Sequence, residues 1–119
     1  MQSWKLNEVE TPGGSRSPVV LESEEAAARA VLIGLEPGQR LGEHEVKEHA
    51  FVLVVDGTVE VEAGSEHTEG SAGTLFLFAP EERHSVTSAE GARLLLFLAP
   101  WPGQGHYRGG DHPRATAAR

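Results

Sequence analysis

Two short segments decide the fold of this chain: GQRLGEHEVKEHAFVLVVDG at residues 38–57 and GTLFLFAPEERH at residues 73–84. Each begins with a glycine and contains a run rich in Val, Leu or Phe, residue types that are compatible with buried strands. The first segment carries His44 and His49, and the second ends at His84. The two segments therefore predict β-structure that bears histidine side chains.

Turn signals surround these segments. Gly, Pro, Asp and Ser residues recur about every eight to twelve residues between Val19 and Leu98, and the stretches between them are short and apolar. This spacing predicts an all-β sandwich or barrel. We expect strands at residues 19–21, 29–35, 51–55, 58–63, 66–69, 74–78, 84–88 and 92–98, and at most one helical turn at residues 24–30.

The length and composition fit a single domain. With 119 residues and 39% hydrophobic side chains, the chain is long enough to bury a core of its own. We expect a β-barrel at residues 19–99. Residues 1–18 and 100–119 are rich in Gly, Pro and polar side chains, so we expect them to form arms, the C-terminal one with a disordered end. Trp101 is expected to pack, either on the barrel mouth or on a partner subunit.

Charge limits the classes of partner. The formal net charge of −8 opposes binding to a phosphate backbone or an anionic membrane surface, so we expect no nucleic-acid or membrane partner. No uncharged apolar run reaches the roughly 18 residues that span a bilayer, and we expect a cytoplasmic protein. The chain has no cysteine, so a transition metal would have to be held by histidine and carboxylate side chains.

From Val31 to Leu98 the sequence resembles the cupin superfamily. The first cupin motif is written G, five residues, H-x-H, three or four residues, E, six residues, G; here it begins at Gly38, ends at Gly57 and has its first histidine at His44. The second motif ends in P-x-G-x-x-H and spans residues 73–84. The resemblance implies a small, single-domain cupin of the cupin-2 type, whose fold is one double-stranded-sheet jelly-roll barrel.

Two positions depart from the first motif. Its second histidine falls on Val46, and its glutamate falls on Ala50. In cupins that hold iron, manganese, nickel or zinc, those two positions complete a set of three histidines and one carboxylate. The resemblance therefore implies a degenerate metal motif in which His44 and His84 remain.

Strand periodicity predicts the lining of the barrel interior. Alternate side chains of a strand share one face, so an inward His44 brings the even-numbered residues of its segment to the same side. The predicted pocket is lined by His44, Val46, Ala50, Val52, Val54, Val59, Val61, His84 and Val86. Such a lining suits a small, largely apolar molecule with one polar group, and we expect binding of such a ligand to be the function.

A metal-dependent enzyme is the alternative. Two side chains hold a divalent ion weakly, because zinc and iron sites generally recruit three or more. His49 reaches the interior only if a bulge lies between Val46 and His49, and His106 only if the C-terminal arm folds over the barrel mouth. This hypothesis assigns one Fe, Mn, Ni or Zn ion to His44, His84 and either His49 or His106, in an isomerase, cyclase or oxygenase. The residues leave open whether the protein is an enzyme.

The face of the segment 51–55 that points away from the interior is also apolar. It carries Phe51, Leu53 and Val55. A strand that is apolar on both faces must be covered on both. Two coverings remain open: a second copy of the chain in a homodimer, which we expect, and the N-terminal arm of the same chain. A non-catalytic assembly module is a third interpretation of this face.

Overall fold

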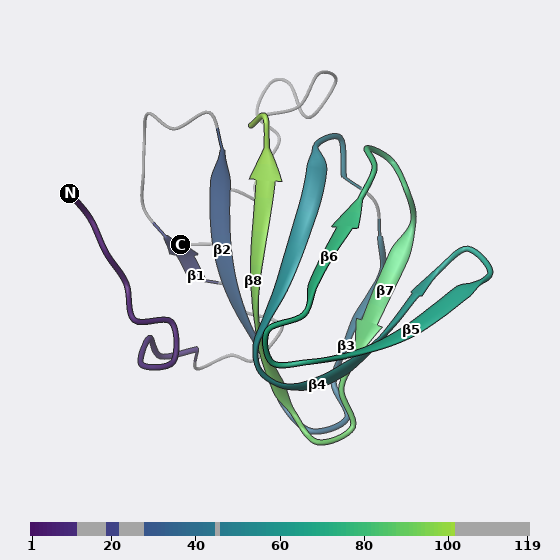
Figure 1. Cartoon of the computed structure of the whole chain (residues 1–119), viewed down its shortest axis with the longest axis horizontal. Coiled ribbons are helices and arrows are strands. Elements are labelled where there is room, and N and C mark those ends of the chain that lie inside the picture. The colour runs from purple at the N-terminus through teal and green to yellow at the C-terminus, as the bar shows by residue number, and fades with distance from the viewer. Residues whose placement is uncertain (12–18, 22–27, 45, 102–119) are drawn as a thin grey trace.

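A computed structural model describes residues 1–11, 19–21, 28–44 and 46–101, with the backbone alone for residues 43 and 44. The described residues form strands and no helix (Figure 1). The strands are β1 (Val19–Leu21), β2 (Arg29–Leu35), β3 (Arg40–His44), β4 (His49–Ala63), β5 (Glu66–Ser71), β6 (Leu75–Phe78), β7 (His84–Thr87) and β8 (Ala92–Ala99). Over the same ranges, no helix exists that could cross a bilayer.

The strands pair into one curled antiparallel sheet. Its order is β1-β2-β8-β4-β7-β3, and β5 and β6 also pair with β4. The first part of β4 pairs with β6 and β8, and its last part pairs with β5 and β7. Because β4 passes from one half of the sheet to the other, the two halves face each other across a common interior (Figure 1). The predicted all-β barrel is confirmed.

One turn prediction was wrong. Asp56 and Gly57 were expected to separate two strands, but β4 continues through them for 15 residues. Its pairing with β8 shifts register between Val54 and Asp56, as at a β-bulge. Gly57 adopts a φ of 85°, and a Cβ added there would collide with the carbonyl oxygen of Gly91. The Asp-Gly pair therefore bends a continuous strand and does not form a hairpin.

The strand β3 was not predicted from the sequence. Its residues, RLGEH, are mostly polar and contain a glycine, so they lack an apolar alternation. Pairing with β7 holds them in the sheet, where Leu41 lies opposite Val86 and His44 lies opposite His84. The expected helical turn at residues 24–30 was wrong at its end, because Arg29 begins β2; residues 24–27 lie outside the described residues.

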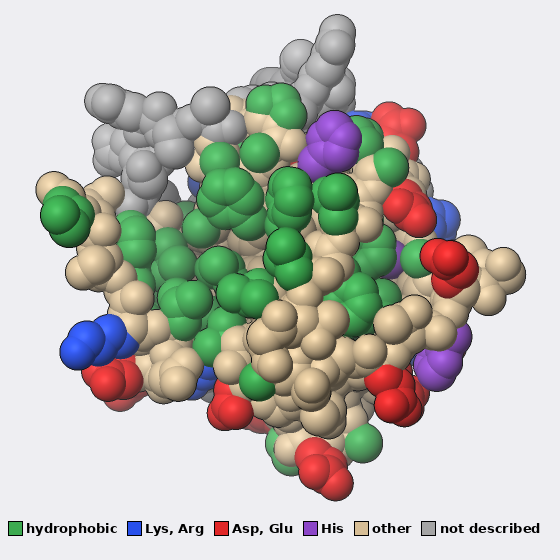
Figure 2. Space-filling model, viewed as in Figure 1, with side chains coloured by type: hydrophobic (Ala, Val, Ile, Leu, Met, Phe, Trp, Pro, Cys, Tyr) green, Lys and Arg blue, Asp and Glu red, His purple; other side chains and the backbone are tan. Residues whose placement is uncertain are grey.

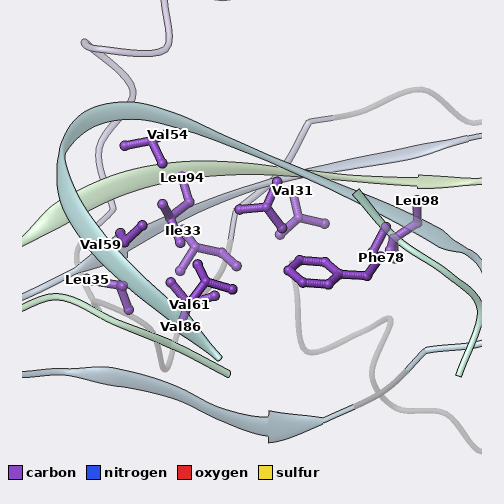
Figure 3. Packing of buried hydrophobic residues seen from close by; sticks show 12 residues of the cluster. Val31, Ile33, Leu35, Val54, Val59, Val61, Phe78, Val86, Leu94 and Leu98 are labelled. Carbon is purple, nitrogen blue, oxygen red and sulfur yellow. The ribbon is translucent and has the colours of Figure 1, made fainter. Parts of the chain in front are cut away.

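The core lies between the two halves of the sheet (Figure 3). It follows the alternation of the strands: Ala50, Val52 and Val54 of β4 are each 2% exposed or less, whereas Phe51, Leu53 and Val55 between them are only half-buried. The buried cluster contains Val31, Ile33, Leu35, Ala50, Val52, Val54, Val59, Val61, Phe78, Val86, Leu94 and Leu98. Burial of each Val, Leu, Ile or Phe side chain stabilises the fold by about 1.5–3 kcal/mol.

The N-terminal segment covers part of the outer face of the sheet. The guanidinium of Arg93 donates hydrogen bonds to the carbonyl oxygens of Leu6 and Val9. Leu32 of β2 is fully buried although its neighbours Val31 and Ile33 face the core. Farther along the same face, hydrophobic side chains are gathered at the surface (Figure 2).

Candidate functional site

His84 is a buried imidazole in a fixed orientation. It begins β7 and is 2% exposed. Its ring stacks on that of Phe78, with 3.8 Å between centroids and 3° between planes. Its Nδ1 lies 3.0 Å from the carbonyl oxygen of Glu82, which can only accept a hydrogen bond. In the neutral ring Nδ1 is therefore the donor, and Nε2 is the nitrogen that carries the lone pair.

Glu48 is a buried carboxylate that the sequence motifs do not predict. It immediately precedes β4 and is 0% exposed. It has the same parity as Ala50, which is buried in the core and pairs with Phe78, the ring that stacks on His84. Its side chain therefore lies on the core side of the sheet, at the same end of the barrel as His84.

The signal that could have found Glu48 is its place in the alternation. It stands two residues before Ala50, the position to which the motif assigns the family's glutamate. Glu48 is separated from Val52 and Val54 by an even number of positions. If the alternation of the strand already begins at Glu48, its carboxylate points to the same interior side as those two valines. From its polarity alone, Glu48 would be expected at the surface, because glutamate is seldom fully buried.

Two loops hold this end of the barrel together. The backbone N–H of Glu81 donates to the carbonyl oxygen of Val46 at 2.6 Å, and Lys47 Nζ lies 3.0 Å from Glu81 Oε2. The backbone N–H of Ala79 donates to Glu82 Oε1 at 2.9 Å. The two contacts of Glu81 join the loop that carries Glu48 to the loop that leads into β7, and the bond between Ala79 and Glu82 stays within the second loop, so together they fix the approach to His84.

The predicted lining residues are brought together. Ala50, Val52, Val54, Val59, Val61 and Val86 are all 4% exposed or less and belong to one cluster, and Val46 is half-buried against it. The backbone of His44 lies opposite that of His84 across the β3–β7 pair, while its side chain is outside the described residues. These side chains are part of the core, and two buried polar residues, Glu48 and His84, lie at one end of it.

Of the two histidines considered as a third metal ligand, the structure describes His49 but not His106. His49 is exposed and lies opposite Ala99 at the start of β4. Its parity is opposite to that of Ala50, so its side chain lies on the face of β4 that points away from the core. His106 lies outside the described residues. Among side chains that the structure does describe, no group of three or more His, Asp or Glu residues is close enough to hold a metal ion.

Trp101 packs on the barrel, as one of the two expectations for it stated. It is half-buried against the hydrophobic cluster. The guanidinium carbon of Arg29 lies 4.5 Å from the centroid of its ring, within the range of a cation–π interaction. The described part of the C-terminal arm therefore ends in contact with the barrel.

Comparison with solved structures shows the same fold. An RmlC-like cupin from Desulfovibrio desulfuricans has a TM-score of 0.72 and 18% identity, covering 84% of this chain and 97% of that chain. An RmlC-like cupin from Shewanella frigidimarina has a TM-score of 0.69 and 23% identity, covering 80% and 85%. The cupin domain of Cnp3 from Schizosaccharomyces pombe has a TM-score of 0.71 and 16% identity, covering 82% and 73%. At these identities the likeness concerns the fold alone.

The sequence comparison gives the family. No curated protein sequence matches the chain. The family model described as a cupin domain matches residues 31–99, which is more than half of the chain. That range contains both motif segments, the buried cluster, Glu48 and His84. The resemblance found in the sequence is confirmed, and the chain belongs to the cupin family.

Proposed function

We propose that this cupin binds one small, largely apolar molecule in the barrel interior, at the end where His84 lies, with His44 opposite. The observation that carries the proposal is the fixed orientation of the His84 ring. The ring is buried, stacks on Phe78 and is hydrogen-bonded through Nδ1 to the carbonyl of Glu82. Since Nε2 of the neutral ring accepts a hydrogen bond, a ligand with a hydroxyl or N–H donor matches it. An apolar body matches the aliphatic lining.

The lining offers apolar surface at the edge of the core as well as inside it. Leu41, Val46 and Phe76 are half-buried side chains packed against the buried cluster, so each has a side that a ligand could cover. Phe76 also stacks on Phe78, with 6.4 Å between ring centroids. Binding next to these side chains would remove apolar surface from water, at about 25 cal/mol for each Å² buried.

The test compares two probes that differ by one polar group. Phenol and toluene are titrated into the full chain carrying labelled Val and Leu methyl groups, and the shifts of Val61 and Val86 report the interior. We expect phenol to bind more tightly than toluene, and we expect His84→Phe, which keeps an aromatic ring, to lower the phenol-to-toluene affinity ratio about fivefold. Shifts confined to Leu77 and Leu95 on the outer face, or an unchanged ratio in His84→Phe, would refute the proposal.

A second candidate is a metal-dependent cupin enzyme of the isomerase, cyclase or oxygenase type. The observation that favours it is Glu48, because it places a buried carboxylate, a common ligand of divalent ions, at the same end of the barrel as His84. With Glu48 in place of His49, the donors become His44, Nε2 of His84 and one carboxylate. Two histidines and a carboxylate form a recurrent set for non-haem iron, and they also suit zinc.

The fit of a divalent ion depends on His44. Glu48 and His84 supply two donors from the described residues, and a third is needed. A bound ion would supply Lewis-acid polarisation of a substrate oxygen. The chain's own contributions are to hold the imidazole tautomer through Glu82 and to exclude water with the aliphatic lining.

Metal analysis separates the two candidates. The full chain is purified without chelator, dialysed, and analysed by plasma mass spectrometry beside His44→Ala, His84→Ala and Glu48→Gln, with His67→Ala as the control because His67 is exposed on β5. The enzyme candidate expects about one equivalent of Fe, Mn, Ni or Zn per chain, lost in the three site variants and kept in the control. Absence of metal from the wild type removes this candidate and leaves the ligand-binding one in place.

A further inference from the structure

The turn that connects β6 to β7 (Figure 1) contains a strained residue. Residues 79–82 form this turn, in which the N–H of Glu82 donates to the carbonyl oxygen of Ala79 at 3.1 Å. Its third residue, Glu81, has a φ of 67° and is the only residue other than glycine with a positive φ among those that the structure describes. A side chain in this left-handed region is strained, because its Cβ approaches the following carbonyl oxygen. Glycine would adopt the same φ without that cost.

The turn has an alternative form without this strain. A proline at the second position, Pro80, and a positive φ at the third are features of a type II turn. A type I turn differs from it mainly by rotation of the peptide between the second and third residues, which takes the φ of the third residue from about +80° to about −90°. This rotation is compatible with the bond between Ala79 and Glu82, and it moves Glu81 out of the left-handed region.

The N–H of the same peptide joins the turn to the loop that carries Glu48. It donates to the carbonyl oxygen of Val46 at 2.6 Å. Rotation of the peptide between Pro80 and Glu81 would point this N–H the opposite way, so the bond to Val46 would be lost. The ion pair between Lys47 and Glu81 also joins the two loops, but its side chains are 38% and 59% exposed, so it contributes little. One peptide rotation therefore relieves the strain at Glu81 and releases the loop of Glu48.

The contributions that favour the two forms of the turn are similar in size. The form described here gains one backbone hydrogen bond and one exposed ion pair, and each is a modest contribution in water. The left-handed conformation of Glu81 opposes them with a comparable cost. Because these contributions largely offset each other, both forms should be populated in solution.

Release of the loop would uncover His84. The imidazole is 2% exposed, so a ligand can reach its Nε2 only after a movement of the chain. The last residue of the turn, Glu82, accepts the hydrogen bond of His84 Nδ1. Glu48, on the other loop, is 0% exposed at the same end of the barrel. Both loops therefore lie against the proposed ligand site, and their separation would open it.

We propose that the peptide between Pro80 and Glu81 is a two-state switch that controls access to His84. In the closed form its N–H binds the carbonyl of Val46 and joins the two loops. In the open form the peptide is rotated, the loop of Glu48 is released, and solvent and ligand reach the imidazole. The role of the switch in ligand entry rests on the proposed function, whereas the motion itself does not.

The test measures how fast diethyl pyrocarbonate modifies His84 in the full chain. The reagent reacts with neutral imidazoles that solvent reaches, and peptide mass spectrometry gives the rate relative to His67, which is exposed on β5. Glu81→Gly and Glu81→Ala both remove the ion pair, but only glycine removes the strain of the closed form. We expect His84 to react about fivefold more slowly in Glu81→Gly than in Glu81→Ala, because the left-handed alanine shifts the population toward the open form by about that factor. Equal rates, or a faster rate in Glu81→Gly, would overturn the proposal.

Leu94→Ala is the control for unfolding of the whole chain. Leu94 is 0% exposed on β8, outside the turn and the loop of Glu48, so this variant destabilises the fold without touching the switch. The rate at His84 should stay within about twofold of the wild type under conditions where Leu94→Ala is folded. A rate that rises in proportion to the loss of stability would show that the reagent reaches His84 only through unfolding, and the switch would be refuted.

Hydrogen exchange of the Glu81 amide gives a second readout in the wild type. We expect this amide to exchange much faster than that of Val52, which lies in β4 between β6 and β8. Protection equal to that of Val52 would contradict an opening turn. Neither measurement contains phenol, so the two proposals are tested separately. The expected rates in a chain that does not bind phenol would refute the proposed function and support the switch, and phenol binding with equal rates in the two Glu81 variants would do the reverse.

Discussion

The two ends of the barrel interior are built from the same strands but differ in chemistry. At one end, Leu35, Val54, Val59 and Leu94 pack together, all 4% exposed or less and all aliphatic (Figure 3). The other end holds Phe78 together with two buried polar side chains, those of Glu48 and His84. We call these the aliphatic end and the histidine end. Burial of an ionisable side chain is costly, and the two that are buried among the described residues, Glu48 and His84, both lie at this end, which indicates that stability and function are divided along the barrel.

The largest expected effect is at the aliphatic end. Leu94 is 0% exposed, so Leu94→Ala leaves a cavity with no surface side chain to fill it. We expect the free energy of unfolding to fall by about 2–5 kcal/mol, measured by urea denaturation. Phenol binding at the histidine end should be unchanged under conditions where the variant is folded. A loss below about 1 kcal/mol would mean that the aliphatic end does not carry the stability assigned to it.

A substitution that strains the backbone at the aliphatic end is expected to lower the free energy of unfolding nearly as much as Leu94→Ala. Gly57→Ala places a Cβ against the carbonyl oxygen of Gly91, at a φ of 85°, so both the conformation and the contact oppose it. We expect a loss of about 2–3 kcal/mol in urea denaturation. Gly64→Ala is the matched control, because Gly64 also has a positive φ, 63°, but no heavy atom would lie within 4 Å of the added Cβ. Its cost should be about 1 kcal/mol, and equal losses would contradict the role of the contact.

A substitution at the histidine end should lower the free energy of unfolding less than Leu94→Ala does, but it should reduce the order of the His84 ring. Phe78→Leu removes the ring that stacks on His84 and keeps an apolar side chain of similar reach. We expect a loss of about 1–2 kcal/mol, smaller than for Leu94→Ala. The ¹H–¹³C signals of the His84 ring should broaden, because the stacking contact is gone while the bond to Glu82 remains. Unchanged ring signals would show that the stack does not orient the imidazole.

The same comparison explains what the sequence could predict. The aliphatic end was predictable, since alternation of Val with polar residues assigns Val59 and Val61 to the interior without knowledge of their partners. The break expected at Asp56 was wrong, because an Asp-Gly pair is compatible with both a hairpin turn and a bulge, and only the pairing with β8 decides between them.

The histidine end was predictable only in part. The motif spacing selected His84, but it assigned the carboxylate position to Ala50 and left Glu48 unnoticed. Glu48 lies in the loop that the backbone of Glu81 binds, and the strand before that loop, β3, gave no strand signal because its sequence is mostly polar. Such contacts join residues more than thirty positions apart, which a local pattern does not register.

The smallest expected effect concerns the ion pair between Lys47 and Glu81, which joins the two loops at the histidine end with 3.0 Å between Nζ and Oε2. Both side chains are substantially exposed, so a double-mutant cycle with Lys47→Ala and Glu81→Ala should give a coupling energy of about 0.2–1 kcal/mol in urea denaturation. The backbone bond from Glu81 to Val46 survives both changes, so the loops should stay joined. A coupling well above this range would mean that the pair orders the loop around Glu48. The affinity for phenol would then fall in the Lys47→Ala variant as well, and the ion pair would belong to the site.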